Sequence, residues 1–545
     1  MAAQIAAHER TVATYFTFLL RSPERDGSLW DSRLWVDIAQ AHVEALANLP
    51  GIAGAELLRP DSNGVFEIEV SGGAAKQGIQ PIWREDGQSP HLDDSHPRGR
   101  GLLATAWRSQ EIQTCPNYAT DPRVLPWREA MAAVGISSAA VLPVEDMRGR
   151  PVFVLALLGA YPRQFESVWM RQFCTGIMQR LSLLWQQSEA ASREVIPETI
   201  AERWRARLFS GGLQMYYQPL VDFLTGKPYQ VEALARLVLE DGRVLLPGQF
   251  LPALGESDLD LLFRLGLLQS LRQVRDWDAA GLSLGVAVNL PPATLLRREC
   301  AHWVRDALAE TGIAAHRLCL EIMETGRLDR DEALREATLR QIADLGVRFA
   351  MDDLGSGFSS LQRLRMLPFH AVKIDQSLLR DARRDPIRVL GFIGALVQLG
   401  RDLELDVVLE GLESEELIEA AAILRAKAGQ GFALAKPMPA AAVTAWVRGF
   451  ALNIDRYAPR TAFGALAAQW RFAHGSGRAV MSADRCAIGR FITAKNLLDS
   501  EIDALHRQVH EIAHQEGLHS ARYLALAARL QSALLGLMTG ADAAG

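Results

Sequence analysis

Between about residues 205 and 450 the chain repeats one pattern: a short apolar run, a polar residue able to bind a metal or a proton, and then an amphipathic stretch. Such alternation predicts β/α units and a parallel sheet, either open or closed. In a closed (β/α)8 barrel, the carboxyl ends of the strands converge on one mouth. The polar residues that follow the apolar runs are Glu232, Asn289, Glu321, the pair Asp352-Asp353, Lys373 and Glu410.

The chemistry of these side chains indicates a hard divalent metal. Carboxylate and amide oxygens suit Mg²⁺ or Mn²⁺ better than zinc. A single acidic residue after a strand has another reading, because such residues often cap the next helix. The adjacent Asp352 and Asp353 are harder to explain in that way, since two neighbouring negative charges repel each other unless a cation binds. The repeated pattern therefore favours a metal site.

Eight short motifs occur in order over the same region, and together they carry a family resemblance. They are Tyr217-Gln218-Pro219, Glu232-Ala233-Leu234 with Arg236, Val288-Asn289-Leu290, Leu320-Glu321-Ile322-Met323-Glu324, the stretch 351–361, Val372-Lys373-Ile374-Asp375, and Glu410-Gly411-Leu412-Glu413 followed by Gln430-Gly431-Phe432. In this order they resemble the EAL family of cyclic di-GMP phosphodiesterases.

The resemblance implies a (β/α)8 TIM-like barrel that hydrolyses cyclic di-GMP to linear pGpG with two Mg²⁺ or Mn²⁺ ions. It assigns Glu232, Asn289, Glu321 and Asp352 to one metal and Asp352, Asp353 and Glu410 to the other. The implied catalytic residues are Lys373, Glu410 and Asp353. The alternative interpretation of Lys373 is an ordinary lysine at a strand end. The implied substrate-binding residues are Gln218, Leu234, Arg236, Glu413 and Gln430.

A regulatory loop is also implied by the resemblance, with Glu324, Gly355 and Gly357 as its members. Leu354, Ser356 and Phe358 stand where the family commonly has phenylalanine, threonine and tyrosine, but none of these departures removes a metal ligand. No stretch resembles the Gly-Gly-Asp-Glu-Phe signature of a cyclase, so synthesis of cyclic di-GMP is not predicted.

Residues 28–185 resemble a GAF sensory domain of α+β class. Apolar runs over 53–58, 65–70, 138–144 and 151–158 predict strands, and a helical pattern begins at Phe165. No proline interrupts that pattern before Pro197, so the helix could transmit a signal as a rigid connector or form a dimer interface. The alternative is a helix that packs on its own domain. The resemblance implies an unknown small-molecule signal. Cys115 is read as a structural cysteine, with a reactive thiol as the alternative.

The last segment, residues 453–545, is expected to be a helical domain. His506, His510 and His514 are spaced to lie on one helical face. With Cys486 upstream they resemble the chemoreceptor zinc-binding family, which implies a possible Zn²⁺ site at Cys486, His506 and His510. Ala467 stands where that family has a further histidine, and the spacing from cysteine to histidine is short. A helical bundle with solvated histidines therefore remains open as the alternative.

Composition limits the compartment and the partners. A net charge of −6 gives no basic surface for a nucleic-acid polymer, and five scattered cysteines indicate a reducing compartment. No apolar run reaches the ~20 residues of a membrane helix, so a cytoplasmic protein without membrane insertion is expected. The family resemblance implies a homodimer. The rival function is a catalytically silent cyclic di-GMP receptor.

The expected parts of the chain are an N-terminal helical segment at 1–27, the GAF-like domain at 28–185, a helical linker at 186–204, the barrel at 205–452 and the helical domain at 453–545.

Overall fold

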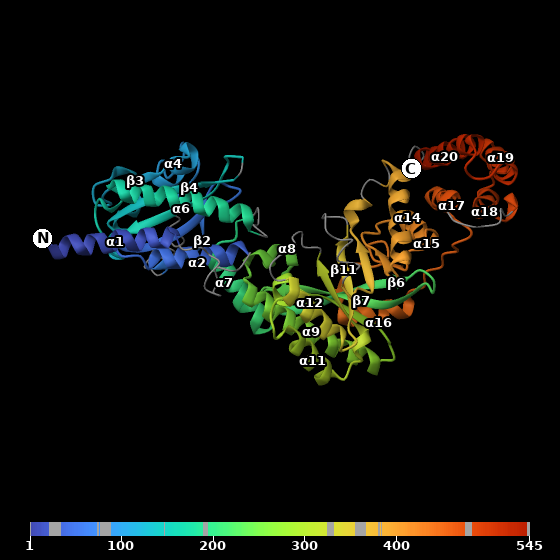
Figure 1. Cartoon of the computed structure of the whole chain (residues 1–545), viewed down its shortest axis with the longest axis horizontal. Helices are drawn as coiled ribbons and strands as arrows, with labels where there is room; N and C mark the ends of the chain where they lie inside the picture. Colours follow the sequence, from blue (N-terminus) through green and yellow to red (C-terminus); the bar gives the residue numbers. More distant parts are fainter. Residues whose placement is uncertain are drawn as a thin grey trace. The chain divides into compact units, whose positions relative to one another are not determined.

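The computed structural model describes residues 2–20, 34–73, 76, 89–146, 148–188, 195–323, 332–354, 367–379, 382, 384–474 and 482–541. Within these ranges the side chains of residues 2–9, 20, 187, 332, 353–354 and 539–541 are not described. The chain divides into two compact units, residues 1–213 with 237–259 and residues 214–236 with 260–545 (Figure 1).

The first unit contains an antiparallel five-stranded sheet in the order β2-β1-β5-β4-β3. The strands are β1 (Ile52–Pro60), β2 (Phe66–Gly73), β3 (Gln113–Cys115), β4 (Ser138–Glu145) and β5 (Pro151–Gly159). The four strands expected from the apolar runs are thereby confirmed. Their residues alternate between two buried faces, as the two-residue period of a strand requires.

Each face of this sheet has its own layer of helices. Phe153, Leu155 and Leu157 of β5 belong to one core, and Val154, Ala156 and Leu158 belong to the other. The first core is completed by α1 (Ala2–Leu20), α2 (Trp35–Ala47) and α6 (Val168–Gln187). The second core is completed by α4 (Leu102–Ser109), the 3-10 helix η3 (Pro122–Trp127) and α5 (Arg128–Ala133). The sheet therefore lies between two helical layers.

The helix α6 is shorter than the uninterrupted pattern towards Pro197 suggested. It ends at Gln187, because Ser188 has extended backbone dihedrals of φ −77° and ψ 149°. The Ser188 hydroxyl donates a hydrogen bond to the Trp185 carbonyl at 2.8 Å, a local bond that competes with the helix. Phe173 and Ile177 bury this helix against its own sheet. A separate helix, α7 (Glu198–Arg207), follows.

The second unit contains a closed eight-stranded barrel, in which β6 (Leu213–Asp222) pairs with both β14 and β7. Seven barrel strands pair in parallel in the order β7-β9-β10-β11-β12-β13-β14, whereas β6 is antiparallel to β14. One strand thus runs against the ideal (β/α)8 pattern. The other barrel strands are β7 (Lys227–Val238), β9 (Gly285–Asn289), β10 (Leu318–Met323), β11 (Arg348–Leu354), β12 (Ala371–Ile374), β13 (Asp406–Leu409) and β14 (Ala428–Gly429).

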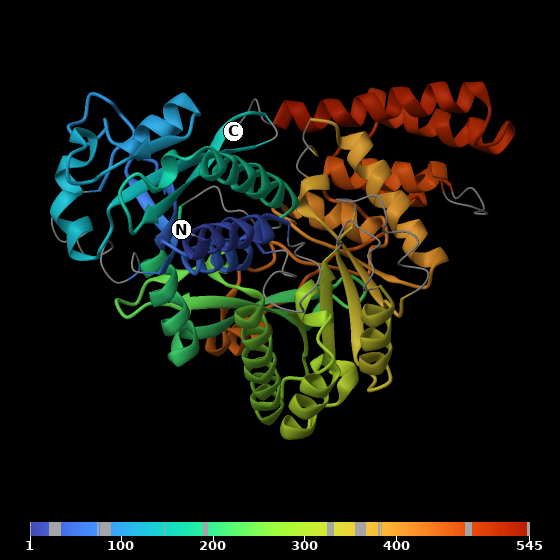
Figure 2. The same ribbon diagram turned by 60° about the vertical axis from the view of Figure 1, so that its left-hand side comes forward.

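Helices cover the outside of the barrel, as the green to orange ribbons in Figure 2 show. Leu267 and Leu271 of one helix and Val304 of the next pack against Val286 and Leu320 of the strands. The covering helices are α9 (Glu256–Ala279), α11 (Cys300–Thr311), α12 (Glu332–Ala343), α14 (Pro386–Asp402), α15 (Glu415–Ile423) and α16 (Ala440–Gly449). Two short strands, β8 (Val244–Leu245) and β15 (Met438–Pro439), extend the sheet.

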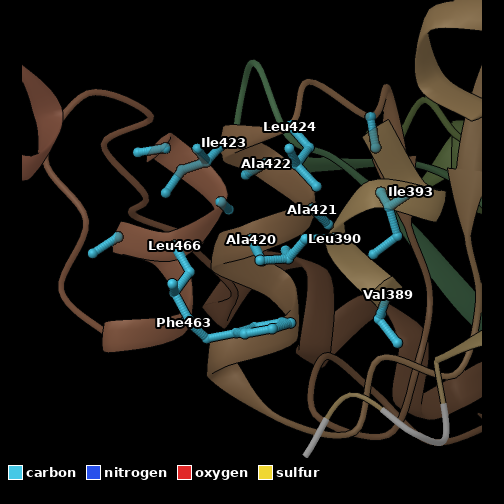
Figure 3. Close-up of a cluster of buried hydrophobic side chains, with 14 of the residues drawn as sticks. Val389, Leu390, Ile393, Ala420, Ala421, Ala422, Ile423, Leu424, Phe463 and Leu466 are labelled. Atoms are coloured by element: carbon cyan, nitrogen blue, oxygen red, sulfur yellow. The ribbon is translucent and has the colours of Figure 1, made fainter. Parts of the chain in front are cut away.

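The C-terminal helices share one core with the barrel. These helices are α17 (Ala462–His474), α18 (Ala487–Ala494), α19 (Glu501–Gln515) and α20 (Ala521–Ala541). Phe463 and Leu466 of α17 pack against the run of alanines at 420–422 in α15 and against α14 (Figure 3). The small alanine side chains permit this close approach. The buried carboxylate of Glu419 also accepts hydrogen bonds from the backbone N–H groups of Arg460 and Thr461, next to the start of α17.

No helix in the described part of the chain combines the length and the apolar character needed to cross a bilayer.

Two glycines of α14 provide a test of this shared core. A Cβ at Gly394 would lie 2.1 Å from the Trp470 ring, whereas a Cβ at Gly391 would lie 3.5 Å from the indole nitrogen. We expect Gly394→Ala to lower the free energy of unfolding of the second unit by about 1–3 kcal/mol through overpacking. Gly391→Ala, the control, should be neutral or stabilising by up to ~1 kcal/mol because alanine favours the helix. Urea unfolding followed by tryptophan fluorescence measures both, and equal effects would contradict the packing described here.

Candidate functional site

The polar residues that follow the apolar runs come together at one mouth of the barrel. Glu232 is on β7, Glu321 on β10 and Asp352 on β11, and Glu410 directly follows β13. These strands are parallel, so their carboxyl ends point the same way. Residues that are up to 178 positions apart in the chain thus become neighbours. Glu232 and Glu410, for example, both contact the Lys373 side chain at the centre of the site.

That central side chain is Lys373, at the third position of the four-residue strand β12. Its side chain is only 2% exposed. The Nζ atom lies 2.6 Å from Glu410 Oε1, 3.0 Å from Glu321 Oε1, 3.3 Å from Glu232 Oε2 and 3.5 Å from Asp352 Oδ1. A buried ammonium is stable only when it is paired and hydrogen-bonded, and this one has four anionic neighbours.

Amide side chains hold Glu232 from the other side. Gln430 Nε2 donates to Glu232 Oε2 at 2.6 Å, and it also lies 2.9 Å from Gln218 Oε1. Gln218 in turn donates to the carbonyl oxygen of Ala435 at 2.9 Å. Asn289 Nδ2 donates to Glu232 Oε1 at 3.1 Å. The orientation of Glu232 is therefore fixed by β6, β9 and the segment after β14 together.

The surroundings shift the pKa values of these carboxyl groups in different directions. Burial favours the neutral form of Glu232, but Lys373 and the hydrogen bonds from Gln430 and Asn289 outweigh burial and lower its pKa. Burial and the neighbouring Glu232 raise the pKa of Glu321 well above its usual range. Burial, helped by the charge of Asp352, raises the pKa of Glu410 to about 7 despite Lys373. The four carboxylates overcome burial and raise the pKa of Lys373. The lysine therefore remains charged.

A cleft opens beside this cluster and leaves about 240 Å³ available to the centre of a water molecule. Four of the five expected substrate-binding residues line the cleft: Gln218, Leu234, Glu413 and Gln430. Gln376 and the exposed ring of Phe432 also line the cleft. Sequence reasoning gave no role to Gln376. Its position just after β12, the strand of Lys373, was the available signal.

Arg236 is placed differently from the other expected substrate-binding residues. It follows Glu232 and Leu234 at two-residue steps on β7, so it shares their face of the strand. It is 6% exposed, and its guanidinium lies over the Tyr216 ring at 5.4 Å from the centroid. One of its N–H groups donates to the carbonyl of Ala235 at 2.8 Å. Arg236 is not among the described residues that line the cleft.

Several expected site residues lie outside what the structure describes. Glu324, Gly355 and Gly357 of the expected regulatory loop fall outside the described residues, and so does the side chain of Asp353. Their roles stay predictions.

A second cluster of possible metal ligands lies among the C-terminal helices. The Sγ atom of Cys486 lies 3.0 Å from His506 Nε2, and one ligand atom from each of Cys486, His506 and His510 lies within 4.8 Å of the others. Cys486 precedes α18 and accepts a hydrogen bond from the N–H of Gly489. His506 and His510 are buried on α19, whereas His514 is exposed. Burial lowers the pKa of His506 to about 4, which leaves a neutral imidazole with a lone pair for a metal.

Two protein-family models match the chain. The model described as the EAL domain matches residues 201–437, and the model described as the GAF domain matches residues 35–178.

Curated relatives cover a similar share of the chain. The bifunctional diguanylate cyclase/cyclic di-GMP phosphodiesterase MucR of Pseudomonas aeruginosa is 35% identical over 233 residues, 42% of this chain and 33% of that protein. The cyclic di-GMP phosphodiesterase PdeR of Escherichia coli is 31% identical over 249 residues, 45% of this chain and 37% of that protein. The chain thus spans about a third of the length of these relatives.

One solved structure that resembles the chain is the PaMucR phosphodiesterase in complex with c-di-GMP. It is 33% identical, and the match covers 44% of this chain and 98% of that one with a TM-score of 0.42.

The buried lysine provides a test of the electrostatics of the site. Lys373→Met leaves the carboxylates without their cation, so in metal-free buffer at pH 8 we expect the free energy of unfolding to fall by about 3–5 kcal/mol. The folded-state pKa values of Glu321 and Glu410 are already raised, so these groups cost stability as pH rises above the unfolded value near 4.5. The loss should therefore be smaller at pH 5.

The matched control is Lys227→Met, because Lys227 is an exposed lysine at the start of β7. It should change stability by less than about 0.5 kcal/mol at either pH. Urea unfolding at the two pH values measures the effect of both substitutions. An equal loss at pH 5 and pH 8 for Lys373→Met would show that carboxylate repulsion is not its cause.

Proposed function

Because the chain contains an EAL domain and a GAF domain, we propose that it hydrolyses cyclic di-GMP to linear pGpG under the control of its flanking domains. The observation that carries this proposal is the buried Lys373 ammonium in contact with four carboxylates at the barrel mouth. Relatives named as cyclic di-GMP phosphodiesterases support the choice of substrate.

The donor set fits hard divalent cations. Four carboxylates face one ammonium, so three negative charges have no counter-charge when all the carboxylates are ionised. Glu321 Oε2 is buried without a hydrogen-bond partner among the described residues. Such oxygens are preferred ligands of Mg²⁺ and Mn²⁺. We expect one ion to be held by Glu232, Asn289, Glu321 and Asp352, and a second by Asp352, Asp353 and Glu410.

The chain's own groups would then bind and orient the diester. Bound divalent ions supply hydroxide at neutral pH and neutralise the charge of a phosphate. Lys373 offers a positive charge at the same mouth, where it orients the attacking water or stabilises the negative charge that develops on the phosphate oxygens. Its contact with Glu410 fixes the Nζ atom in place. The amides of Gln218 and Gln430 hold Glu232 in the orientation that the site requires.

The periphery of the cleft would recognise the rest of the substrate. Leu234 offers an apolar wall and Glu413 an exposed carboxylate. Arg236 carries a planar guanidinium that suits a phosphate, and to reach one it would leave the Tyr216 ring.

Regulation is expected to come from outside the cleft. The GAF domain would bind a small-molecule signal, and the loop with Glu324, Gly355 and Gly357 would couple the metal site to packing between two copies of the chain in a homodimer.

The rival proposal is a receptor that binds cyclic di-GMP without cutting it and passes the signal to a partner. Loss of a metal ligand or of the lysine would favour a receptor, and the chain keeps all of these residues.

Turnover by the purified full chain decides between the two functions. With Mg²⁺ or Mn²⁺ we expect conversion of cyclic di-GMP to pGpG, resolved by ion-exchange chromatography. Removal of the ions with a chelator should stop the conversion. Glu232→Ala should lower the rate at least about a hundredfold, the effect typical of losing one strong electrostatic contact. The control, Glu240→Ala, changes an exposed glutamate just after β7 and should leave the rate unchanged. Tight binding with no turnover would establish the receptor.

We also propose that Cys486, His506 and His510 bind one Zn²⁺ ion. The mixed sulfur and imidazole ligands suit zinc better than magnesium. The neutral His506 and the closeness of the three ligand atoms support the proposal, in contrast to the alternative of solvated histidines.

Zinc content after dialysis tests this second proposal. We expect one Zn²⁺ per chain by mass spectrometry of the native protein and a lower unfolding temperature after zinc removal. Cys486→Ser and His506→Ala should lose the ion, whereas the control His514→Ala should keep it, because His514 is an exposed histidine of the same helix. Equal zinc content in all three variants would place the ion elsewhere.

A further inference from the structure

The N-terminal domain has a cavity on the face of its sheet that α4, η3 and α5 cover. The cavity leaves about 40 Å³ available to the centre of a water molecule and opens partly to solvent. Most of its wall is apolar, from the strands as well as from Leu102, Val124 and Met131, and Trp127 and Tyr118 add aromatic surfaces. None of the described lining residues is a lysine, an arginine or a histidine. A ligand here would meet no positive charge.

One carboxyl group points into this apolar space. Glu56 lines the cavity and is 1% exposed. It lies in the middle of β1, opposite Ala156 of β5, which in turn lies opposite Val141 of β4. The small side chain of Ala156 leaves room beside the carboxyl group. Among the described residues, none makes a hydrogen bond to Glu56 Oε1.

A buried polar atom without a partner costs free energy, and ordinary packing does not explain its presence. A second carboxyl group, that of Glu198, acts on Glu56 and raises its pKa further. Glu198 of α7 accepts a hydrogen bond from Ser71 Oγ at 2.6 Å, and Ser71 lies opposite Glu56 on β2. Lys76 forms an ion pair with Glu198 at 3.2 Å, so the positive charge of Lys76 already has an anionic partner.

We propose that this cavity binds a small, largely apolar molecule that carries one protonated amino group, with the ammonium donating to Glu56 and the apolar body packed against Trp127. The inference rests on the proposed sensory role of the GAF domain, but binding here can be measured without any turnover at the barrel.

The choice of a cation over an anion or a neutral molecule follows from the cavity. An anion would be buried in an apolar cavity whose described lining offers no cationic partner, and the charge of Glu198 acts on this cavity. A purely apolar molecule would leave Glu56 Oε1 as unsatisfied as before. An ammonium provides the missing donor in a charge-assisted hydrogen bond, and the aromatic rings tolerate a cation at their faces.

The acidity of Glu56 adds a signature of this binding mode. Burial, with help from Glu198, raises the pKa of Glu56 to about 8, so the group is mostly protonated at pH 7. Tyr118, the other titratable group among the described residues of the cavity wall, stays neutral because burial raises its pKa. Binding an ammonium stabilises the Glu56 carboxylate, and the proton on the carboxyl group then leaves to the buffer. We expect close to one proton to be released per ligand at pH 7.

Titration calorimetry on the full chain tests the proposal with three matched probes: benzylamine, benzyl alcohol and benzoate. Benzylamine should bind at least tenfold more tightly than benzyl alcohol, and benzoate should not bind. Repeating the benzylamine titration in buffers of different ionisation enthalpy measures the released proton. Equal affinity for the alcohol and the amine, tighter binding of benzoate, or no binding by any probe would overturn the proposal.

Two variants separate the carboxyl group from the space around it. Glu56→Gln keeps the shape and should abolish both the preference for the amine and the proton release. Ala156→Leu keeps the carboxyl group but fills the space beside it, so it should weaken all binding. Circular dichroism confirms that each variant is folded, and the proton count on the unmodified chain needs no variant at all. A failure here with normal hydrolysis of cyclic di-GMP would refute the ligand class alone, whereas a failure of hydrolysis with normal amine binding would refute the enzymatic proposal alone.

Discussion

The contact between Lys373 and four carboxylates is the interaction on which the barrel mouth depends. Neither partner is stable without the other, because a buried ammonium needs anions and clustered carboxylates need a cation. Closure of the sheet by β6 brings these groups within a few ångströms, and it also brings Gln218 to Gln430 and so to Glu232. When all four carboxylates are ionised, an excess of negative charge remains at this mouth, and the proposed binding of divalent cations rests on it.

The sequence predicted this site well because the position of each residue follows from its strand. Glu232, Glu321, Asp352 and Lys373 each lie near the end of an apolar run, and parallel strands carry such ends to the same place. Contacts set by three-dimensional packing were less visible. The antiparallel direction of β6 cannot be read from its composition, and the end of α6 depends on a local hydrogen bond of Ser188 that competes with an unbroken helical pattern.

The group of Cys486 and His506 and the buried Glu56 also depend on three-dimensional packing that the sequence does not reveal. The short spacing from Cys486 to His506 argued against a metal site, yet the position of Cys486 before α18 brings its sulfur to 3.0 Å from the histidine. Glu56 gave no signal at all in the sequence, because one acidic residue within a strand is compatible with a solvent-facing position. Only the pairing of β1 between β2 and β5 shows that this residue faces a covered side of the sheet.

The chain also connects Glu56 of the N-terminal domain with the candidate site at the barrel mouth. A change of charge at Glu56 acts on Glu198, since the two carboxyl groups repel each other in a buried environment. Glu198 belongs to α7, which a short helical segment, Leu208–Gly212, separates from β6, and β6 carries the Gln218 that contacts Gln430. Gln430 holds the Glu232 carboxylate at 2.6 Å. A ligand that ionises Glu56 therefore changes the electrostatic environment of α7, and α7 precedes along the chain the strand that carries Gln218.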